Sequence, residues 1–436
     1  NVSLTGRDGM TLSGPVTASG QLSLGTSAGK TILVTGQLQA SDTLIDNGIV
    51  QVGNGGNTGS IQGHVTNNAA LVYNRSDSVA VGGVISGSGS LRQQGSGTLA
   101  LTAANTYTGA TVVAAGTLAL SGMGSIASSS GVQVGGSAVF DVSSMNAAQA
   151  EVGAISGSGT ISLGAKTLSV GSSNSTSTFS GAISGTGGLR KTGAGTLTLS
   201  GTNNYAGGTE LKEGRIDLGN SSALGGGTLS MDDGTTLGFV ANGLTIANAI
   251  VLTGTQDPVI DTGSFDATLA GGISGGGFLT KEGSGTLTLS GANDYTGATS
   301  VAAGTLRAGA ADTLSAASFH SVASGATLDL AGFSQRIAGL NNSGVVSLTG
   351  SAPGATLTVT GPYVGNNAVL RMGTALGNSA SVSDRLVLSG AAAVASGQTT
   401  IQVTNLGGLG ALTSGNGIEV VSADNGATTT AQTSRN

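Results

Sequence analysis

The 436-residue sequence contains no cysteine and no tryptophan, only four prolines, and few charged residues, which make up 8% of the chain. Without cysteine the chain cannot form disulfides or thiolate metal sites. The shortage of proline and the lack of a strict Gly-X-Y period exclude a collagen-like chain. The low charge argues against a charged disordered tail, and the net charge of −6 argues against nucleic acid as a partner.

Long apolar runs are also missing. The sequence has no signal peptide and no run of 18 apolar residues that could cross a membrane as a helix. Asn1 begins in the middle of a strand-like pattern, VSLTG, so we expect the chain to be a fragment of a longer one. The absence of cysteine suits a chain that crosses a membrane unfolded, because a disulfide would lock it.

Glycine, by contrast, is abundant, with 79 residues. Between glycine-rich turns lie short segments in which apolar residues alternate with threonine or serine, such as TLTLSG at 196–201 and TLDLAG at 327–332. This alternation predicts short strands. Convincing helical patterns are nearly absent. The best candidate, residues 143–152, lacks a clear apolar stripe and is predicted to be a loop.

One phrase occurs three times and dominates the sequence. Residues 85–109, 183–207 and 273–297 align without a gap, within longer copies near 82–121, 181–218 and 271–309. Such self-similarity is typical of stacked supersecondary units. At 436 residues with no change of composition, the chain is too long for one β-sandwich. The sequence therefore predicts an all-β fold, a right-handed parallel β-helix with a C-terminal cap.

In this fold the repeated leucines should point into the core, with threonine and serine outside. The candidate core residues of the three copies are Leu99, Leu101, Leu197, Leu199, Leu287 and Leu289. The copies begin about 90–100 residues apart, at Ile85, Ile183 and Ile273, so we expect the coils between them to be degenerate. Residues 220–266 carry little recognisable repeat, and we expect loops to protrude there.

Short motifs for catalysis or cofactor binding do not withstand inspection. GTSAGKT at 25–31 has three residues between its glycines where a phosphate-binding loop needs four, so a strand-to-strand turn is expected. GISGG at 272–276 resembles a nucleophile elbow around Ser274, but an elbow needs a following helix and a nearby histidine. His64 and His320 lack a second histidine at metal-ligand spacing and are predicted to be solvated loop residues. We predict no catalytic, cofactor or metal site.

An asparagine and a tyrosine recur in register at Asn105 and Tyr107, and again in the copies at 203–205 and 293–295. Two interpretations are open. The residues could form a stacked ladder of turns with satisfied amides, or a surface row of tyrosines for contact with sugar or protein.

The pattern GxGxLxKxGxGTLTLSGxNxYxGxTxVxxGTL resembles the passenger-associated transport repeat of autotransporters. Residues 383–429 are similar to the C-terminal folding module of pertactin-like passengers. The resemblance implies a β-helix stalk over 1–336 and a cap over 337–436 that promotes folding, with Leu386 and Leu388 as its candidate core. It also implies export through the periplasm and the outer membrane to the bacterial cell surface. The intact protein would then carry a signal peptide and a C-terminal outer-membrane barrel, its only link to the membrane.

From this resemblance we expect a non-enzymatic surface passenger that acts as an adhesin or a self-associating protein through an extended polar face. The expected partners are a host matrix protein, a glycan or another copy of the chain, and no cofactor is expected. The alternative is a passive stalk that presents an enzyme or toxin domain missing from the N-terminus. Independently of either role, the C-terminal module would fold first and template the coils before it.

Overall fold

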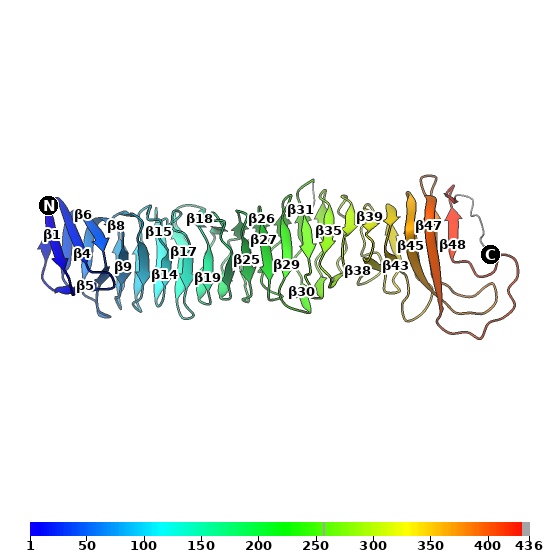
Figure 1. The fold of residues 1–436 in the computed structure, drawn as a ribbon, viewed down its shortest axis with the longest axis horizontal. Coiled ribbons are helices and arrows are strands. Elements are labelled where there is room, and N and C mark those ends of the chain that lie inside the picture. The colour runs from blue at the N-terminus through cyan, green and yellow to red at the C-terminus, as the bar shows by residue number, and fades with distance from the viewer. Residues whose placement is uncertain (256–257, 430–436) are drawn as a thin grey trace. The chain divides into compact units, whose positions relative to one another are not determined.

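The computed structural model describes residues 1–255 and 258–429, and it divides into two compact units, Asn1–Gly227 and Thr228–Asn436. In each unit the described strands pair in parallel and follow one another along a solenoid, as the blue-to-green and green-to-red parts of Figure 1 show. The parallel β-helix is therefore confirmed, and its right-handed sense stays a prediction. Across 1–255 and 258–429 we find no helix at all, and so none that is long and apolar enough to cross a membrane.

The first unit contains four sets of strands that pair one after another. One set is β1 (Val2–Gly6), β4 (Gln21–Thr26), β6 (Gln37–Asn47), β8 (Ser60–Asn67) and β11 (Ile85–Ser86), with β3 (Val16–Thr17) also on β6. The second is β10 (Ser78–Val81), β13 (Thr98–Leu101), β15 (Thr117–Gly122), β17 (Val139–Met145), β20 (Thr160–Ser162) and β23 (Ala182–Ser184). The third is β18 (Gln149–Val152), β21 (Thr167–Val170), β24 (Leu189–Lys191) and β26 (Thr209–Leu211). The fourth is β2 (Met10–Leu12), β5 (Thr31–Val34), β7 (Ile49–Val52), β9 (Ala70–Tyr73), β12 (Ser90–Gln93), β14 (Thr111–Val113), β16 (Val132–Val134), β19 (Ile155–Gly157), β22 (Ser177–Phe179), β25 (Thr196–Leu199) and β27 (Arg215–Leu218).

The second unit is built in the same way. One set is β28 (Leu229–Met231), β31 (Ile250–Leu252) and β34 (Ile273–Gly275). The next is β29 (Thr236–Phe239), β32 (Val259–Asp261), β35 (Leu279–Glu282), β37 (Thr299–Val301), β39 (Phe319–Val322), β42 (Gly339–Asn342), β45 (Tyr363–Thr374), β47 (Val394–Asn405) and β49 (Thr428–Thr429). Another is β30 (Leu244–Ile246), β33 (Ala267–Leu269), β36 (Thr286–Leu289), β38 (Thr305–Ala308), β40 (Thr327–Asp329) and β43 (Val345–Ser347), which also reaches β45. The last is β41 (Gln335–Ile337), β44 (Thr356–Val359), β46 (Arg385–Ser389) and β48 (Val421–Asp424).

The register of neighbouring strands places residues of the same type beside one another. Leu99 pairs with Leu118, one coil of 19 residues further on, and Leu287 pairs with Leu306 in the same way. Each coil thus buries the aliphatic side chains of its neighbour, while the strands hydrogen-bond at the usual separation of about 4.8 Å. Glycine permits the tight corners: Gly304 has φ of 63°, and a Cβ there would lie 2.4 Å from the carbonyl oxygen of Gly283.

One sequence expectation about an irregular segment is wrong. Residues 143–152 are not a loop, because they contribute the end of β17 and all of β18. Their alanine and valine side chains alternate with polar ones and enter the core, a pattern too short to recognise as a strand. The weak-repeat segment 220–266, where we expect loops to protrude, contributes strands β28 to β32 to the coil. Hydrogen bonding to the strands of neighbouring coils stabilises strands here that the local sequence pattern does not predict.

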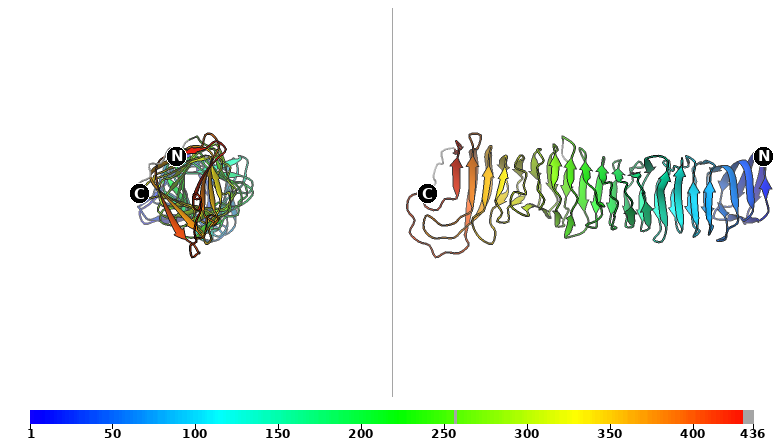
Figure 2. Two further views of the ribbon diagram at one scale, coloured as in Figure 1. Left: turned by 90° about the vertical axis from the view of Figure 1, so that its right-hand side faces the viewer. Right: turned by 180° about the vertical axis from the view of Figure 1, so that it is seen from behind.

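The C-terminal end of the second unit differs from the rest. β45 and β47 are each 12 residues long. Long loops leave the stack after them, as the orange and red segments in Figure 2 show.

Candidate functional site

The structure places the six predicted core leucines inside the coils. Leu99, Leu101, Leu197, Leu199, Leu287 and Leu289 are at most 1% exposed. The threonines between them point outward and are half-buried, as in β25 and β36. Leu386 and Leu388 of the predicted folding module also lie inward, at 4% and 0% exposure.

The recurring asparagines close the turns of the repeat. The side-chain oxygen of Asn105 accepts the N–H of Ile85 at 2.9 Å, and Asn203 and Asn293 do the same for Ile183 and Ile273. Their amide groups in turn donate to carbonyl groups of the next coil, 20 residues further on. Of the two interpretations left open by the sequence, the stacked ladder of turns is the one observed.

The tyrosines are not a surface row. Tyr107, Tyr205 and Tyr295 are fully buried, and each hydroxyl hydrogen-bonds a threonine four residues on, as Tyr295 does with Thr299 at 2.7 Å. Burial raises the pKa of Tyr295 to about 12, because the phenolate would lose its hydration. These rings support the turn from inside and cannot contact a ligand, so the surface-row interpretation is wrong.

Sequence reasoning missed two buried lysines. Lys191 and Lys281 are at most 1% exposed, and the Lys281 amine donates to the carbonyl oxygens of Glu282, Gly283 and Ala303. Lys191 caps the same turn of the preceding copy. Burial lowers the pKa of both amines, that of Lys281 to about 8. The sequence did contain a signal, because the three aligned copies carry a long side chain with N–H donors at this position: Gln93, Lys191 and Lys281. In the structure Gln93 donates to the carbonyl oxygens of Gly95 and Gly97.

The two histidines differ from each other and from the prediction. His64 is exposed, lies in β8 rather than in a loop, and accepts the N–H of Val84. His320 is buried in β39, where burial lowers its pKa to about 4, so it is not a solvated loop residue. In the parallel register His320 pairs with the buried Leu340, so the two side chains lie on the same inward face of the strands. In the part of the chain that the structure describes, no three His, Asp or Glu side chains form a group that could hold a metal ion.

The other motifs take structural roles. Residues 25–31 are the end of β4, a turn and the start of β5, as predicted. Ser274 lies in β34 and pairs with Val251 of the neighbouring coil. No helix follows it in the described part of the chain, so the strand-turn-helix context of a nucleophile elbow is missing.

The second unit presents one continuous row of outward side chains, which we name the outer row. The register aligns one residue from each strand of the β30-to-β47 stack: Thr245, Thr268, Thr288, Arg307, Asp329, Ser347, Arg371 and Gln402. All are half-buried or exposed. Hydroxyl, amide and charged groups thus repeat at the strand separation of about 4.8 Å along one face. Such a row can make many weak hydrogen bonds to an extended partner.

The C-terminal module is held by a buried carboxylate that sequence reasoning did not single out. Asp384 is 0% exposed. One of its oxygens accepts the N–H groups of Gly354 and Ala355 at 2.8 and 2.9 Å, and the other accepts that of Gly373 at 2.7 Å. This side chain therefore ties the loop before β44 to the end of β45, next to the start of β46.

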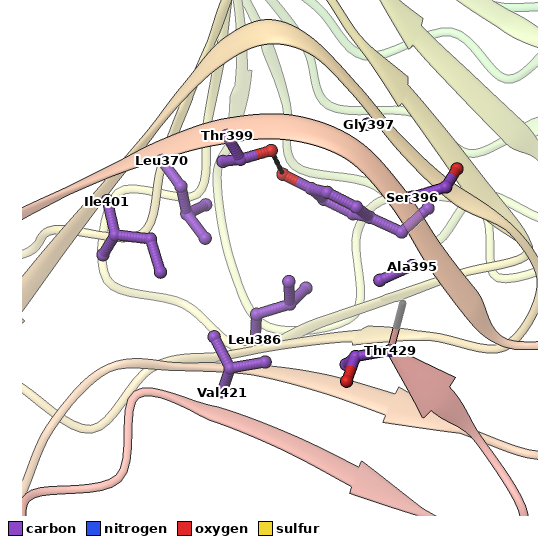
Figure 3. Close-up of a pocket in the computed structure, with 10 residues that line it drawn as sticks. Leu370, Leu386, Ala395, Ser396, Gly397, Thr399, Ile401, Val421 and Thr429 are labelled. Carbon is purple, nitrogen blue, oxygen red and sulfur yellow. Dashed lines mark hydrogen bonds between the residues drawn. The ribbon is translucent and has the colours of Figure 1, made fainter. Parts of the chain in front are cut away.

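A hollow of about 80 Å³ opens in this module, between β45, β46, β47 and β48 (Figure 3). Leu370, Leu386, Ile401 and Val421 point into it, and the hydroxyl of Tyr363 meets that of Thr399 at 2.9 Å on its rim. On the outer edge of β47, only Val394 and Ala395 pair with a described strand, β49. Described strands therefore leave part of the apolar interior at this edge of β47 uncovered.

Two family models match the chain. Residues 91–120, 189–218 and 279–308 match the passenger-associated-transport-repeat, and residues 336–435 match the Autochaperone Domain Type 1. Over 235 residues, 52% of the chain, it is 37% identical to the adhesin BmaC autotransporter of Brucella suis. Two Escherichia coli proteins are also similar: uncharacterized protein YuaQ, 38% identical over 37% of the chain, and probable autotransporter YfaL, 44% identical over 19%. The aligned parts cover only 6%, 12% and 6% of these three relatives.

Proposed function

This chain is an autotransporter passenger domain, exported to the bacterial cell surface through the outer membrane, and we propose that it acts there as a non-enzymatic adhesin. The observation that carries the proposal is the outer row, an extended polar face without a catalytic constellation in the described residues. The similarity to a relative named as an adhesin supports the same role.

The proposed mechanism is multivalent contact. A single threonine or arginine of the outer row contributes little, since a surface hydrogen bond or ion pair is worth about 1 kcal/mol or less. Many such contacts on one rigid face, and many chains on one cell, raise the overall affinity by orders of magnitude without a deep pocket. Host matrix protein, glycan or a second copy of the chain are the partners we consider.

The test is to display residues 1–436 on a heterologous outer-membrane anchor. Adhesion to immobilised matrix proteins and glycans, and clumping of the cells, are counted against cells with the anchor alone. A gain of either activity supports the adhesin. A folded, displayed and inert chain would contradict it and would favour a passive stalk that presents another domain.

A pair of matched variants locates the contact. Thr268→Val with Thr288→Val removes two hydroxyls from the outer row while keeping β-branched side chains that suit strands. Thr280→Val with Ser300→Ala removes two hydroxyls from β35 and β37, which belong to another set of strands. We expect adhesion to fall in the first pair and to persist in the second. Equal adhesion in both pairs would exclude the outer row.

We also propose a folding role for residues 337–436. Asp384 joins three backbone groups from two separate segments, and Leu386 and Leu388 are buried beside it in β46. These contacts give the module a core of its own that could form first and offer a template to the next coil. The agreement with the range of the autochaperone family model supports this proposal.

A further inference from the structure

A groove of about 580 Å³ lies beside the outer row in the second unit. Thr288 of β36 and Arg307 of β38 line it. Phe333, from the turn after β40, and Thr349 and Ser351, from the loop after β43, line it as well. Because the coils stack in register, segments that follow successive strands meet at the same corner of the solenoid. The volume lies within the range of small-molecule sites, about 300–1,000 Å³.

Close contact between two turns shapes this corner. Gly332, with φ of 83°, touches Gly350 of the next coil, where a Cβ on Gly350 would lie 2.6 Å from the Cα of Gly332. Gly309 and Gly350 line the groove itself. Since glycine has no side chain, these two positions add no side-chain volume to the groove.

Phe333 supplies an exposed aromatic ring. Its exposed fraction is 40%, whereas Phe140 and Phe179 are completely buried. A half-exposed ring in the wall of a groove offers a flat apolar surface that a ligand can cover, with a gain in free energy that grows with the area removed from water.

The polar groups of the groove are electrically balanced. The Nε of Arg307 lies 3.6 Å from the Asp329 carboxylate, and the two side chains are 51% and 21% exposed. Asp329 also accepts the N–H of Ala331 at 3.0 Å, which restrains the orientation of its carboxylate. The terminal nitrogens of Arg307 form no hydrogen bond within residues 1–255 and 258–429, so they can donate to a ligand. Arg371, further along the outer row, is engaged through its Nε with Gln402.

We propose that this groove binds a neutral sugar unit of a glycan, an inference that rests on the proposed adhesin function and names its ligand class. A pyranose ring has an apolar face of C–H groups that can cover Phe333. Its hydroxyls both donate and accept, which matches the guanidinium of Arg307 and the hydroxyls of Thr288, Thr349 and Ser351. An acidic sugar would need a net positive charge in the groove. The carboxylate of Asp329 balances the charge of Arg307, so a neutral sugar fits better.

The experiment uses the purified 436-residue chain, labelled and applied to an array. The array carries neutral oligosaccharides that end in glucose, galactose or mannose, together with sialylated and sulfated ones. Three variants accompany the wild type. Phe333→Ala removes the ring, Arg307→Gln removes the charged donor, and Phe278→Ala is the control, because Phe278 is an equally exposed ring, at 39%, that does not line the groove.

We expect the wild type and Phe278→Ala to bind the same neutral glycans. Phe333→Ala and Arg307→Gln should each bind about tenfold more weakly, the factor for losing a partly buried ring or one charge-assisted hydrogen bond. Binding of charged glycans alone, binding of no glycan, or equal binding by Phe333→Ala and the wild type would each overturn the groove proposal.

The same variants, displayed on cells, separate this proposal from the adhesin function. Cells that adhere equally with the wild-type and Phe333→Ala chains would overturn the groove and leave the adhesin standing. Cells that fail to adhere, although the purified chain binds neutral glycans through Phe333, would support the groove and overturn the adhesin.

Discussion

The third repeat copy and the C-terminal module lie in the same unit, but their strands bury apolar side chains to different extents. In the repeat, strands of three or four residues bury every second side chain, and Leu287 and Leu289 of β36 are 0% exposed. In the module, β47 is 12 residues long and leaves Ile401 and Val403 at 39% and 49% exposure. The repeat has a coil on each side, whereas described strands cover β47 fully on one edge only.

The difference shows what stabilises a solenoid. A coil in the middle gains from two neighbours, so small aliphatic side chains and turn-capping amides suffice. Where described strands cover a coil fully on one edge only, as at β47, fixed contacts of other kinds contribute more to its stability. Here a buried carboxylate, Asp384, supplies them, while the repeat uses Asn293 and Lys281 at its turns. Four variants, one of them a double substitution, test this comparison in order of decreasing effect.

The largest effect is expected from Leu386→Asp combined with Leu388→Asp. Two carboxylates in an apolar core cost several kcal/mol, on the order of the whole stability of a domain, about 5–15 kcal/mol. If the module templates the coils before it, the repeat copies should also lose protease resistance on displayed cells. Val387→Asp, on the outer side of the same strand, should have little effect. If the repeat copies of the double variant kept their protease resistance, the proposal that the module acts as a template would be contradicted.

Asp384→Asn should destabilise the module by about 2–4 kcal/mol, because an amide offers one acceptor oxygen where the carboxylate serves three N–H groups. Hydrogen exchange should show lost protection at Gly354, Ala355 and Gly373 in particular. Asp424→Asn, at an exposed carboxylate of β48, serves as the control. Unchanged exchange at the three amides would mean that Asp384 does not hold the module.

His320 makes the second unit sensitive to acid. Its folded pKa, about 4, is below its unfolded value of about 6.5, so the unfolded state binds more protons between these pH values. The free energy of unfolding is therefore highest above pH 6.5, where His320 is neutral in both states. It falls by up to about 3 kcal/mol as the pH drops to 4. Urea unfolding across this range should show the loss in the wild type and in His64→Leu. His320→Leu should have a flatter profile, and a profile as steep as the wild type would refute this role.

The smallest effect is expected from Lys281→Gln, which installs the residue type of the first copy. The change should alter stability by about 1 kcal/mol or less at pH 7, since it exchanges a partly dehydrated charge for a neutral donor. The folded pKa of Lys281, about 8, is below the unfolded value of about 10.4, so wild-type stability should gain from a rise in pH between these values. The variant should lack this gain, and Lys30→Gln, at an exposed lysine, should keep it. Identical profiles for Lys281→Gln and the wild type would exclude a titrating Lys281.

Much of the fold could be predicted without coordinates. The threefold phrase indicated a solenoid, and the alternation of leucine and threonine assigned the faces of β13, β25 and β36. These are properties of period and spacing, which a strand imposes on its own side chains. The resemblance to autotransporter passengers, based on the same repeats, was confirmed by the family models.

The buried polar residues were another matter. Lys281 was passed over, His320 was predicted to be a solvated loop residue, and for Tyr295 a stacked ladder of turns and a surface row were both left open; all three are buried. The groove at Arg307 and Phe333 was not predicted either, because its residues come from four successive coils. Lys281 and His320 lie in strands β35 and β39, and Tyr295 lies between β36 and β37. A polar group inside the coil needs a hydrogen-bond partner, and the alternation of residues along one strand does not show which partner the fold provides. The sequence by itself therefore determined the coil and its aliphatic core. Only the stacking of one coil on the next decided which polar residues close the turns inside and which remain outside for a ligand.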